Sequence, residues 1–459
     1  MDITKLPFVP AFVKNKIKSR PELQQMTSNF VWLLFDKVLR ILVFMFVNAW
    51  MARFLGPKDW GLFNYSTNFA TLFAPLTTLG LNAVVIREII RKPERTYDII
   101  GSTFLLKLVG AVVLFVVTAI SIFFVRQGDT ETMLMVIISA SGYLFLSLDA
   151  IDLHFQSQLQ SKYTVIAKDI AFLLVNVVKM FLLYFKADLM WFIWVTMLEM
   201  VLGSVFLIWA YRLRKFKIMK WNLRFKVSKD LIAMSWPMLI AGLANNIQGY
   251  IDQIMLADLM GNDALGQYSA AFKLIVSISF IPMIIYSSVA PDVTKAKQNN
   301  ESLYYFKLLR IYQIMFIISV LLAIPIVFLS DFIILFLYGN EYTGASFLLS
   351  LMVVRLFFAN FGVAKTLFIT NNDLFKYSLL TSILGALFNI LLNYILIPIY
   401  SAAGAIYASF ISYSLTIFLV DIFYKPMHRN LGVMLKSIFD IPDYFRILRQ
   451  RIINQNNPK

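Results

Sequence analysis

The feature that most constrains this chain is a series of apolar segments, most of them 18 to 25 residues long, between about residue 30 and residue 424. In a helix, about 20 apolar residues span the hydrocarbon core of a bilayer. Because backbone polar groups in hydrocarbon must be satisfied within the segment, these segments should be helices; a membrane barrel would need short alternating strands. With 59% hydrophobic and 15% charged residues, the chain is too apolar for a soluble domain. The sequence predicts an all-α polytopic membrane protein.

We predict twelve transmembrane spans, and an even number places both termini on the same side of the membrane. The spans are 30–54, 60–84, 99–125, 132–153, 164–185, 189–211, 230–256, 264–290, 311–329, 345–369, 378–398 and 402–424. The predicted domains are a cytoplasmic N-terminal segment 1–29, a six-helix lobe 30–211, a cytoplasmic linker 212–229, a second six-helix lobe 230–424 and a basic cytoplasmic tail 425–459. The N-terminal segment is basic and lacks the cleavage site of a signal peptide.

The distribution of positive charge predicts the orientation. Of the 42 Lys and Arg residues, 30 lie in the termini and in the alternate loops on one side. The opposite loops hold only Lys58, Arg126 and Lys186, with Arg53 at the border. The positive-inside rule then places both termini in the cytoplasm. The net charge of +16 is thus mostly explained by membrane topology, and little of it remains as an argument for binding to nucleic acid. The basic tail is expected to lie on anionic membrane lipids.

Composition excludes or disfavours several kinds of chemistry. The chain has no cysteine and only two histidines, His154 and His428, which excludes disulfides, thiol nucleophiles and a histidine-rich metal centre. No nucleotide-binding loop is present. Asp149 and Asp152 stand beside His154 at the end of the fourth span, but no second acidic cluster accompanies them. We therefore expect no metal, no cofactor and no enzymatic activity.

One turn occurs twice along the chain. The stretch ARFLGPKDWGLFNY at 52–65 and the stretch ADLMGNDALGQYSA at 257–270 each connect two apolar spans. Their glycines align, Gly56 with Gly261 and Gly61 with Gly266. The offset equals half of a twelve-span chain, so spans one to six and seven to twelve are predicted to be homologous halves. Since six is even, both halves insert in the same direction, as in the parallel repeats of transporters whose substrate site lies at the repeat interface.

Charged residues within the spans require an explanation, because a charge at mid-bilayer costs about 2.5–3.5 kcal/mol on insertion scales. In the first span Asp36 and Arg40 can pair at i, i+4, and Lys37 shares a face with Arg40. We interpret the excess of cations as the lining of a wet cavity for an anionic substrate. The candidate cavity cations are Lys37, Arg40, Arg53, Lys273 and Arg355. Snorkelling or ion pairing is the simpler interpretation of three lysines near span ends: Lys107, Lys168 and Lys365.

Polar residues of the seventh span form a second candidate group. Asn245, Gln248 and Asp252 recur at i, i+3 and i+7 on one helical face. They and Asp36 are candidates for binding sugar hydroxyls or a coupling ion. Hydrogen bonding between helices, worth about 0.6 kcal/mol per pair in membranes, is the alternative. It is the favoured interpretation for Asn389 and Asn393 in the eleventh span.

Four stretches of the sequence resemble a known group of proteins. They are SWPMLIAGLANNIQGYIDQIMLADLMGNDALGQYSAA, FLGPKDWGLFNYS, LGLNAVVIREI and YGNEYTGA. Together they resemble the Wzx-type polysaccharide flippases of the multidrug/oligosaccharidyl-lipid/polysaccharide (MOP) exporter superfamily, and the resemblance extends from about residue 28 to 424.

The resemblance implies a fold, a function and site residues. The fold would be a V-shaped bundle of twelve helices in two lobes. The function would be the movement of an undecaprenyl-diphosphate-linked oligosaccharide from the inner to the outer leaflet by alternating access, in the biosynthesis of O-antigen or lipopolysaccharide. Related flippases use basic residues of the first span, its outer end and the eighth span; Lys37 and Arg40, Arg53, and Lys273 occupy comparable places here. A polysaccharide polymerase and a chain-length regulator are candidate partners.

Three other functions remain open. A cation-coupled drug antiporter of the same superfamily would favour acidic cavities, and the excess of cations argues against it. A membrane glycosyltransferase would usually need an acidic metal site or a large outer loop, and the predicted outer loops are short. A structural scaffold would not explain the charges in the first span.

Overall fold

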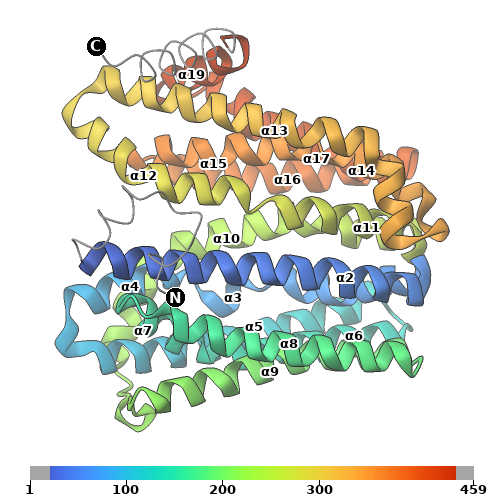
Figure 1. Cartoon of the computed structure of the whole chain (residues 1–459), viewed down its shortest axis with the longest axis horizontal. Coiled ribbons are helices and arrows are strands. Elements are labelled where there is room, and N and C mark those ends of the chain that lie inside the picture. Colours follow the sequence, from blue (N-terminus) through green and yellow to red (C-terminus); the bar gives the residue numbers. More distant parts are fainter. Residues whose placement is uncertain (1–20, 441–459) are drawn as a thin grey trace, which may run out of the picture. The chain divides into compact units, whose positions relative to one another are not determined.

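The computed structural model describes residues 21–440 and, from Leu39 onward, all side chains except those of Leu42 and Phe44. This part of the chain is helical and contains no strand (Figure 1). Nine of its helical segments are long and apolar enough to cross a membrane, or ten if the bent pair Asn340–Met352 and Arg355–Asn371 counts as one span. The prediction of an all-α polytopic membrane fold is confirmed.

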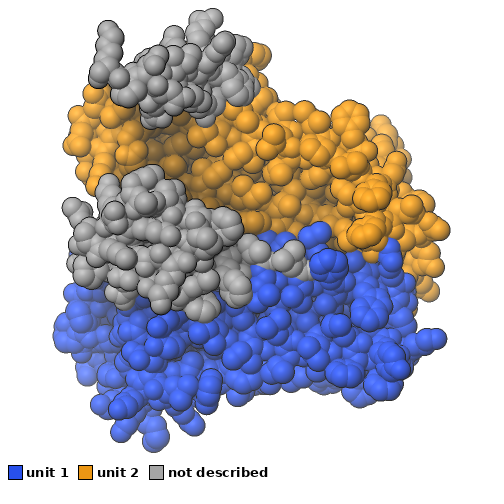
Figure 2. All heavy atoms as spheres, in the orientation of Figure 1, with its two compact units in different colours: residues 1–55, 62–246 blue, residues 56–61, 247–459 orange. Residues whose placement is uncertain are grey.

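The chain folds into two compact units, coloured separately in Figure 2. Unit 1 comprises residues up to 55 and 62–246, and unit 2 comprises residues 56–61 and those from 247 onward. The division falls inside α10 (Phe225–Met260). The other helices of unit 1 are α2 (Pro21–Leu72), α3 (Pro75–Thr78), α4 (Leu81–Arg91), α5 (Thr96–Val125), α6 (Thr130–Ser141), α7 (Ala150–Ser157), α8 (Ser161–Tyr184) and α9 (Leu189–Leu213). Unit 2 contains α11 (Asn262–Ile278), α12 (Ile281–Asn299), α13 (Glu301–Tyr338), α14 (Thr343–Met352), α15 (Arg355–Asn371), α16 (Phe375–Tyr400), α17 (Ala402–Ser414), α18 (Val420–Ile422) and α19 (His428–Phe439).

Two features account for the difference between twelve predicted spans and ten. The first two predicted spans are counted as the single apolar segment Leu39–Arg91, although the backbone of α2 is non-helical at Gly56, between the two predicted spans. The predicted fifth span coincides with α8, which carries Lys162, Lys168, Asp169 and Lys179 and is therefore less apolar than the rest. The count of twelve stays a prediction.

The repeated turn has nearly the same backbone in both copies. Gly56 has φ 72° and ψ 171°, and Gly261 has φ 90° and ψ 169°. Both values of φ lie in the region that only glycine adopts readily, so each glycine allows a sharp change of direction between two helical segments. The prediction of a tight turn is confirmed at Gly56 and Gly261 rather than at the second glycine of each copy.

Within unit 2 the two turns pack against one another through their second glycines. A Cβ atom on Gly61 would lie 1.8 Å from the carbonyl oxygen of Asn262, and a Cβ atom on Gly266 would lie 1.9 Å from the carbonyl oxygen of Pro57. Because Asn262 follows Gly261 as Pro57 follows Gly56, the two contacts are reciprocal. Gly61 and Gly266 are therefore needed for close approach of two backbones.

Each unit has its own apolar core. In unit 1, Leu81, Val85, Ile100 and Leu231 are buried together, which fixes the start of α10 against α4 and α5. The core of unit 2 is rich in aromatic side chains contributed by α13 and α15, with Tyr312, Phe361 and Phe368 fully buried. Such aromatic pairs add about 0.5–1.5 kcal/mol each beyond the area that they bury.

Candidate functional site

A polar pocket lies inside unit 1, and we call it the Arg40–Lys168 pocket. Its volume is about 560 Å³, which is in the range of small-molecule binding sites. It is lined by residues of α2, α4, α7, α8, α9 and the 3₁₀ segment Gly142–Asp149. The lining residues are Arg40, Ile86, Leu146, Asp149, Asp152, Gln156, Ser161, Thr164, Val165, Lys168, Glu199, Met200, Gly203 and Ser204.

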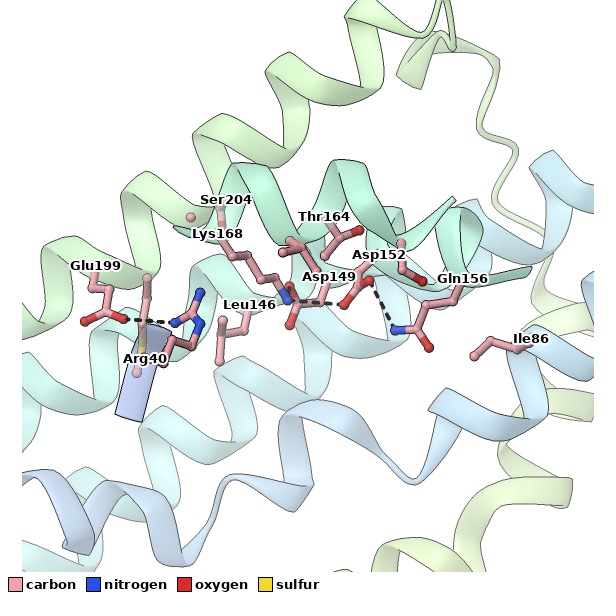
Figure 3. Close-up of a pocket in the computed structure, with 14 residues that line it drawn as sticks. Arg40, Ile86, Leu146, Asp149, Asp152, Gln156, Thr164, Lys168, Glu199 and Ser204 are labelled. Carbon is pink, nitrogen blue, oxygen red and sulfur yellow. Dashed lines mark hydrogen bonds and ion pairs between the residues drawn. The ribbon is translucent and has the colours of Figure 1, made fainter. Parts of the chain in front are cut away.

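Lys168 occupies the middle of the pocket between two carboxylates (Figure 3). Its Nζ lies 2.9 Å from Oδ1 of Asp149 and 3.2 Å from Oδ2 of Asp152. The aspartates stand three residues apart where the 3₁₀ segment meets α7, so both can face the same lysine. Gln156 donates a hydrogen bond of 3.1 Å to Asp152. The result is a connected polar surface rather than a single ion pair.

Arg40 is held at the other end of the pocket by α8 and α9. Its Nη2 lies 3.1 Å from Oδ1 of Asp169, and its Nη1 lies 3.9 Å from Oε1 of Glu199. The guanidinium also lies over the ring of Phe172, 4.8 Å from the centroid, a cation–π contact that helps to orient it. The Arg40 side chain remains 28% exposed, so it can still meet a ligand in the cavity.

Two buried lysines extend this network. Lys107 on α5 is 2% exposed and interacts electrostatically with Asp149 and Asp152. Lys179 on α8 is 8% exposed and interacts with Glu199. Among the described side chains, the four cations of the network meet four carboxylates, namely those of Asp149, Asp152, Asp169 and Glu199. The described part of this site is therefore balanced in charge, whereas the sequence led us to expect a surplus of cations.

The remaining candidates of the first span fall in different places. The side chains of Asp36 and Lys37 lie outside the described residues. Arg53 is exposed near the end of the first helical segment of α2, and it does not line the Arg40–Lys168 pocket. Of the first-span candidates, the structure thus places Arg40 in the pocket.

A second polar centre lies inside unit 2 around Asp252. This side chain is fully buried on α10. It accepts hydrogen bonds from Asn393 at 2.8 Å, Ser409 at 2.5 Å and Tyr268 at 3.3 Å. The described residues offer Asp252 no cation within ion-pair distance, although Arg355 acts on it electrostatically. A buried carboxylate held by neutral donors is costly unless it is protonated or meets a cation.

The other candidate cations of the second half lie in unit 2. Arg355 at the start of α15 donates a hydrogen bond of 3.0 Å to the hydroxyl of Tyr413, and its Nη1 is buried without a hydrogen-bond acceptor. Its guanidinium lies 5.1 Å from the ring centroid of Phe272. Lys273 on α11 lies 5.3 Å from the ring of Trp60, beside the repeated turn. The structure therefore brings Arg355, but not Lys273, to the surroundings of Asp252.

The polar residues of the seventh span do not form one surface. Gln248 is buried and donates a hydrogen bond of 3.0 Å to Ser412 on α17, close to the Asp252 centre. Asn245, three residues earlier, is exposed and belongs to unit 1. Gln248 and Asp252, four residues apart on α10, both form hydrogen bonds with α17, and a role of these residues in binding sugar or an ion stays a prediction.

Several residues of both centres were not among the candidate site residues, although the sequence interpretation allowed an ion pair for Lys168 and favoured a hydrogen bond between helices for Asn393. Asp149, Asp152 and Lys168 line the pocket, and Asn393 and Ser409 hold Asp252. The i, i+3 spacing of the aspartates was a usable signal, whereas the pairing with Lys168 depends on how α7 and α8 pack. His154 has both ring nitrogens engaged, at 3.0 Å from the Tyr211 hydroxyl and 2.9 Å from Gln158, so it is a packing residue. Lys168 and Ser409 lie on other helices than the aspartates that they contact, and the spacing of residues along one helix cannot reveal such contacts.

The fold of the chain is shared with membrane transporters of known structure, some of which belong to the MOP superfamily. Its structure is similar to that of a multidrug resistance MATE transporter of this superfamily in an inward-facing conformation, with a TM-score of 0.67 and 16% identity, covering 91% of this chain and 99% of that one. It is also similar to the lipid II flippase MurJ in an inward closed conformation, with a TM-score of 0.66 and 14% identity, covering 92% of this chain and 93% of that one. At such identities the likeness establishes the fold.

The sequence identifies the family. Residues 26–297, more than half of the chain, match the family of polysaccharide biosynthesis proteins, and the chain belongs to that family. It is 25% identical to a candidate O-antigen transporter of Shigella flexneri, over 72% of this chain and 81% of the relative. It is 22% identical to the capsular polysaccharide biosynthesis protein CapF of Staphylococcus aureus, over 87% of this chain and 99% of the relative. The resemblance to polysaccharide exporters of the MOP superfamily is confirmed.

Proposed function

We propose that the protein is a flippase that moves an undecaprenyl-diphosphate-linked oligosaccharide from the inner to the outer leaflet of the bacterial cytoplasmic membrane by alternating access. The observation that carries this proposal is the Arg40–Lys168 pocket, a cavity with charged and polar lining residues in unit 1, among helices most of which belong to segments apolar enough to cross a membrane. Membership of a polysaccharide biosynthesis family supports a saccharide substrate. The likeness to the lipid II flippase supports a lipid-linked one.

The lining of the pocket suits both parts of such a head group. Arginine binds phosphate oxygens through two parallel N–H groups. Arg40 could do so by exchanging its 3.9 Å contact with Glu199 for a phosphate, while Asp169 at 3.1 Å keeps it in place. Carboxylate, amide and hydroxyl groups at Asp152, Gln156 and Thr164 can exchange hydrogen bonds with sugar hydroxyls. We assign Arg40 to the diphosphate and the Lys168 end to the first sugars.

The test is complementation of a deletion strain, with the position of the lipid-linked oligosaccharide as the readout. Arg40→Glu, alone or with Lys37→Glu, should abolish export and leave the lipid-linked oligosaccharide at the inner leaflet. Arg40→Gln should lower export about tenfold or more, because a charge-assisted hydrogen bond is worth about 1.5–3 kcal/mol. Arg91→Gln is the matched control, since Arg91 is exposed on α4 and does not line the pocket. Normal export by a correctly inserted Arg40→Glu protein would refute the assignment.

Asp252 is the proposed binding site for a coupling ion, either a proton or Na⁺. Asp252 is fully buried and forms no ion pair with the described residues, so binding a small cation would offset the cost of burying its charge. The membrane potential contributes about 2.3 kcal/mol per charge per 100 mV, and an ion carried inward would add to the drive. In proteoliposomes, Asp252→Asn should remove the dependence of transport on an imposed proton or Na⁺ gradient. A gradient dependence equal to that of the wild type would exclude Asp252 as the ion site.

One observation favours a second function, drug export. The pocket presents the three carboxylates of Asp149, Asp152 and Glu199, which could attract an organic cation. The same deletion strain distinguishes the two functions, because a drug antiporter would lower its drug susceptibility and a polysaccharide flippase would restore its surface polysaccharide. A glycosyltransferase would be recognised by a new covalent product when the purified protein meets lipid-linked sugar.

A further inference from the structure

Unit 1 has a second cavity, an apolar groove between α5 and the start of α10, which shares no lining residue with the Arg40–Lys168 pocket. We call it the α5–α10 groove, and its volume is about 510 Å³. Its walls include Leu105 and Val109 of α5 and Leu223 and Ile232 on the other side. Val109 is 51% exposed and Ile232 is 43% exposed, so the groove opens to the surroundings of the helices.

The polar end of this groove is fixed by contacts between α5 and the residues before α10. The backbone N–H of Asn222 donates a hydrogen bond of 3.2 Å to the carbonyl of Tyr97, and its side chain donates one of 3.2 Å to Asp98. A Cβ atom on Gly101 would lie 2.6 Å from the carbonyl oxygen of Asn222. This glycine therefore permits direct contact of the two backbones, which gives the groove a rigid end.

Two cations border the groove at that end. Arg224 lines it and forms an ion pair with Asp98, with Nε 2.8 Å from the carboxylate. Lys229 also lines it, is exposed, and forms no ion pair with a described residue. The surrounding segment 212–229 contains eight Lys and Arg residues and no Asp or Glu. The groove thus joins an apolar wall to a rim that carries the cations Arg224 and Lys229.

We propose that the α5–α10 groove binds an anionic phospholipid, with an acyl chain along Leu105, Val109 and Ile232 and the phosphate at Lys229. Charge complementarity selects the ligand, because basic pockets at the cytoplasmic ends of membrane helices bind anionic head groups. The positive-inside rule predicts that segment 212–229 faces the anionic inner leaflet. The inference goes beyond the proposed transport function, since it concerns a resident lipid and uses none of the residues assigned to the substrate.

The test is native mass spectrometry of the purified full chain with added lipids of matched acyl chains. We expect the wild type to retain phosphatidylglycerol at least about tenfold more strongly than phosphatidylcholine. Lys229→Gln should remove most of this preference, and Val109→Trp should abolish retention by filling the groove. The matched controls are Val113→Trp, which alters an exposed residue one turn further along α5, and Lys217→Gln, which removes an exposed cation of the same segment outside the groove.

Three results would overturn the proposal. Equal retention of the two phospholipids would indicate ordinary boundary lipid. The same loss in Val109→Trp and Val113→Trp would show that the groove is not the site. Displacement of phosphatidylglycerol by undecaprenyl phosphate at equal concentration would assign the groove to the lipid-linked substrate. Export by Lys229→Gln, measured in the deletion strain, separates this inference from the proposed function, because lipid retention and transport are read independently.

Discussion

Lys365 and Asp421 form an ion pair deep inside unit 2. Lys365 Nζ lies 2.6 Å from Oδ1 of Asp421, and the two side chains are 6% and 0% exposed. The lysine also donates hydrogen bonds of 3.1 Å to the carbonyl oxygens of Thr416 and Ile417. These carbonyls lie in the π-helical turn Leu415–Leu419, where the usual hydrogen-bond ladder of a helix is interrupted. Tyr377 donates a further hydrogen bond to Asp421.

Removing one member of this pair should destabilise the protein strongly. Lys365→Met leaves a buried carboxylate without its counter-charge, and we expect a loss of about 3–5 kcal/mol in the free energy of unfolding. The double variant Lys365→Met, Asp421→Leu should recover most of it, because no buried charge remains. The measurement is the melting temperature in detergent. A single variant as stable as the wild type would show that the pair is not a determinant of stability.

The outcome for charged residues shows what a single sequence can predict at this scale. The position of a lysine along a predicted span can be read from the sequence. For Lys168 and Lys365, this position indicated snorkelling or ion pairing. The sequence does not identify the carboxylate that pairs with each lysine. Asp149 and Asp421 lie on other helical segments, and the packing of these segments depends on contacts throughout the core. For the same reason the contacts of Arg40 with Asp169 and Glu199 could not be foreseen from the sequence.

At the scale of elements, the paired turns make a prediction about glycines. Gly61→Ala and Gly266→Ala should each lower the melting temperature, because the new methyl group would lie within 2 Å of a carbonyl oxygen and two backbones must separate. Overpacking of this kind costs about 1–3 kcal/mol or more. Gly249→Ala on α10 is the matched control, since a Cβ atom there meets nothing within 4 Å. It should be neutral or slightly stabilising, because alanine favours a helix over glycine.

The role of these glycines could be predicted only in part. Their repetition in the sequence, with equal spacing and similar neighbours, correctly indicated a tight turn in both halves. The sequence did not show why the second glycine of each copy is needed. Each of these glycines contacts the other copy of the turn, which lies about 200 residues away in the sequence. The apolar runs likewise predicted the helices well, since membrane length and hydropathy are local properties.

At the scale of the whole molecule, the number of transmembrane spans depends on whether α8 crosses the membrane. It carries Lys168, Asp169 and Lys179, which would make it a poor span by itself. In the folded protein, however, Lys168 and Asp169 have oppositely charged partners, and Lys179 is 8% exposed. Their desolvation is therefore offset by protein contacts rather than by water. We predict that α8 crosses and that the chain has twelve spans with both termini in the cytoplasm.

Because the natural chain has no cysteine, single cysteines can report this topology without background. Lys162→Cys lies in the first turn of α8, Lys186→Cys lies just after its end, and Lys217→Cys lies in the segment that joins α9 to α10; all three positions are exposed. In intact spheroplasts a membrane-impermeant maleimide should label Lys186→Cys alone, and permeabilisation should add the other two. If Lys162→Cys and Lys186→Cys were labelled from the same side, α8 would not cross. The number of spans would then be odd, and the termini would lie on opposite sides of the membrane, which would also remove the parallel relation between the two halves.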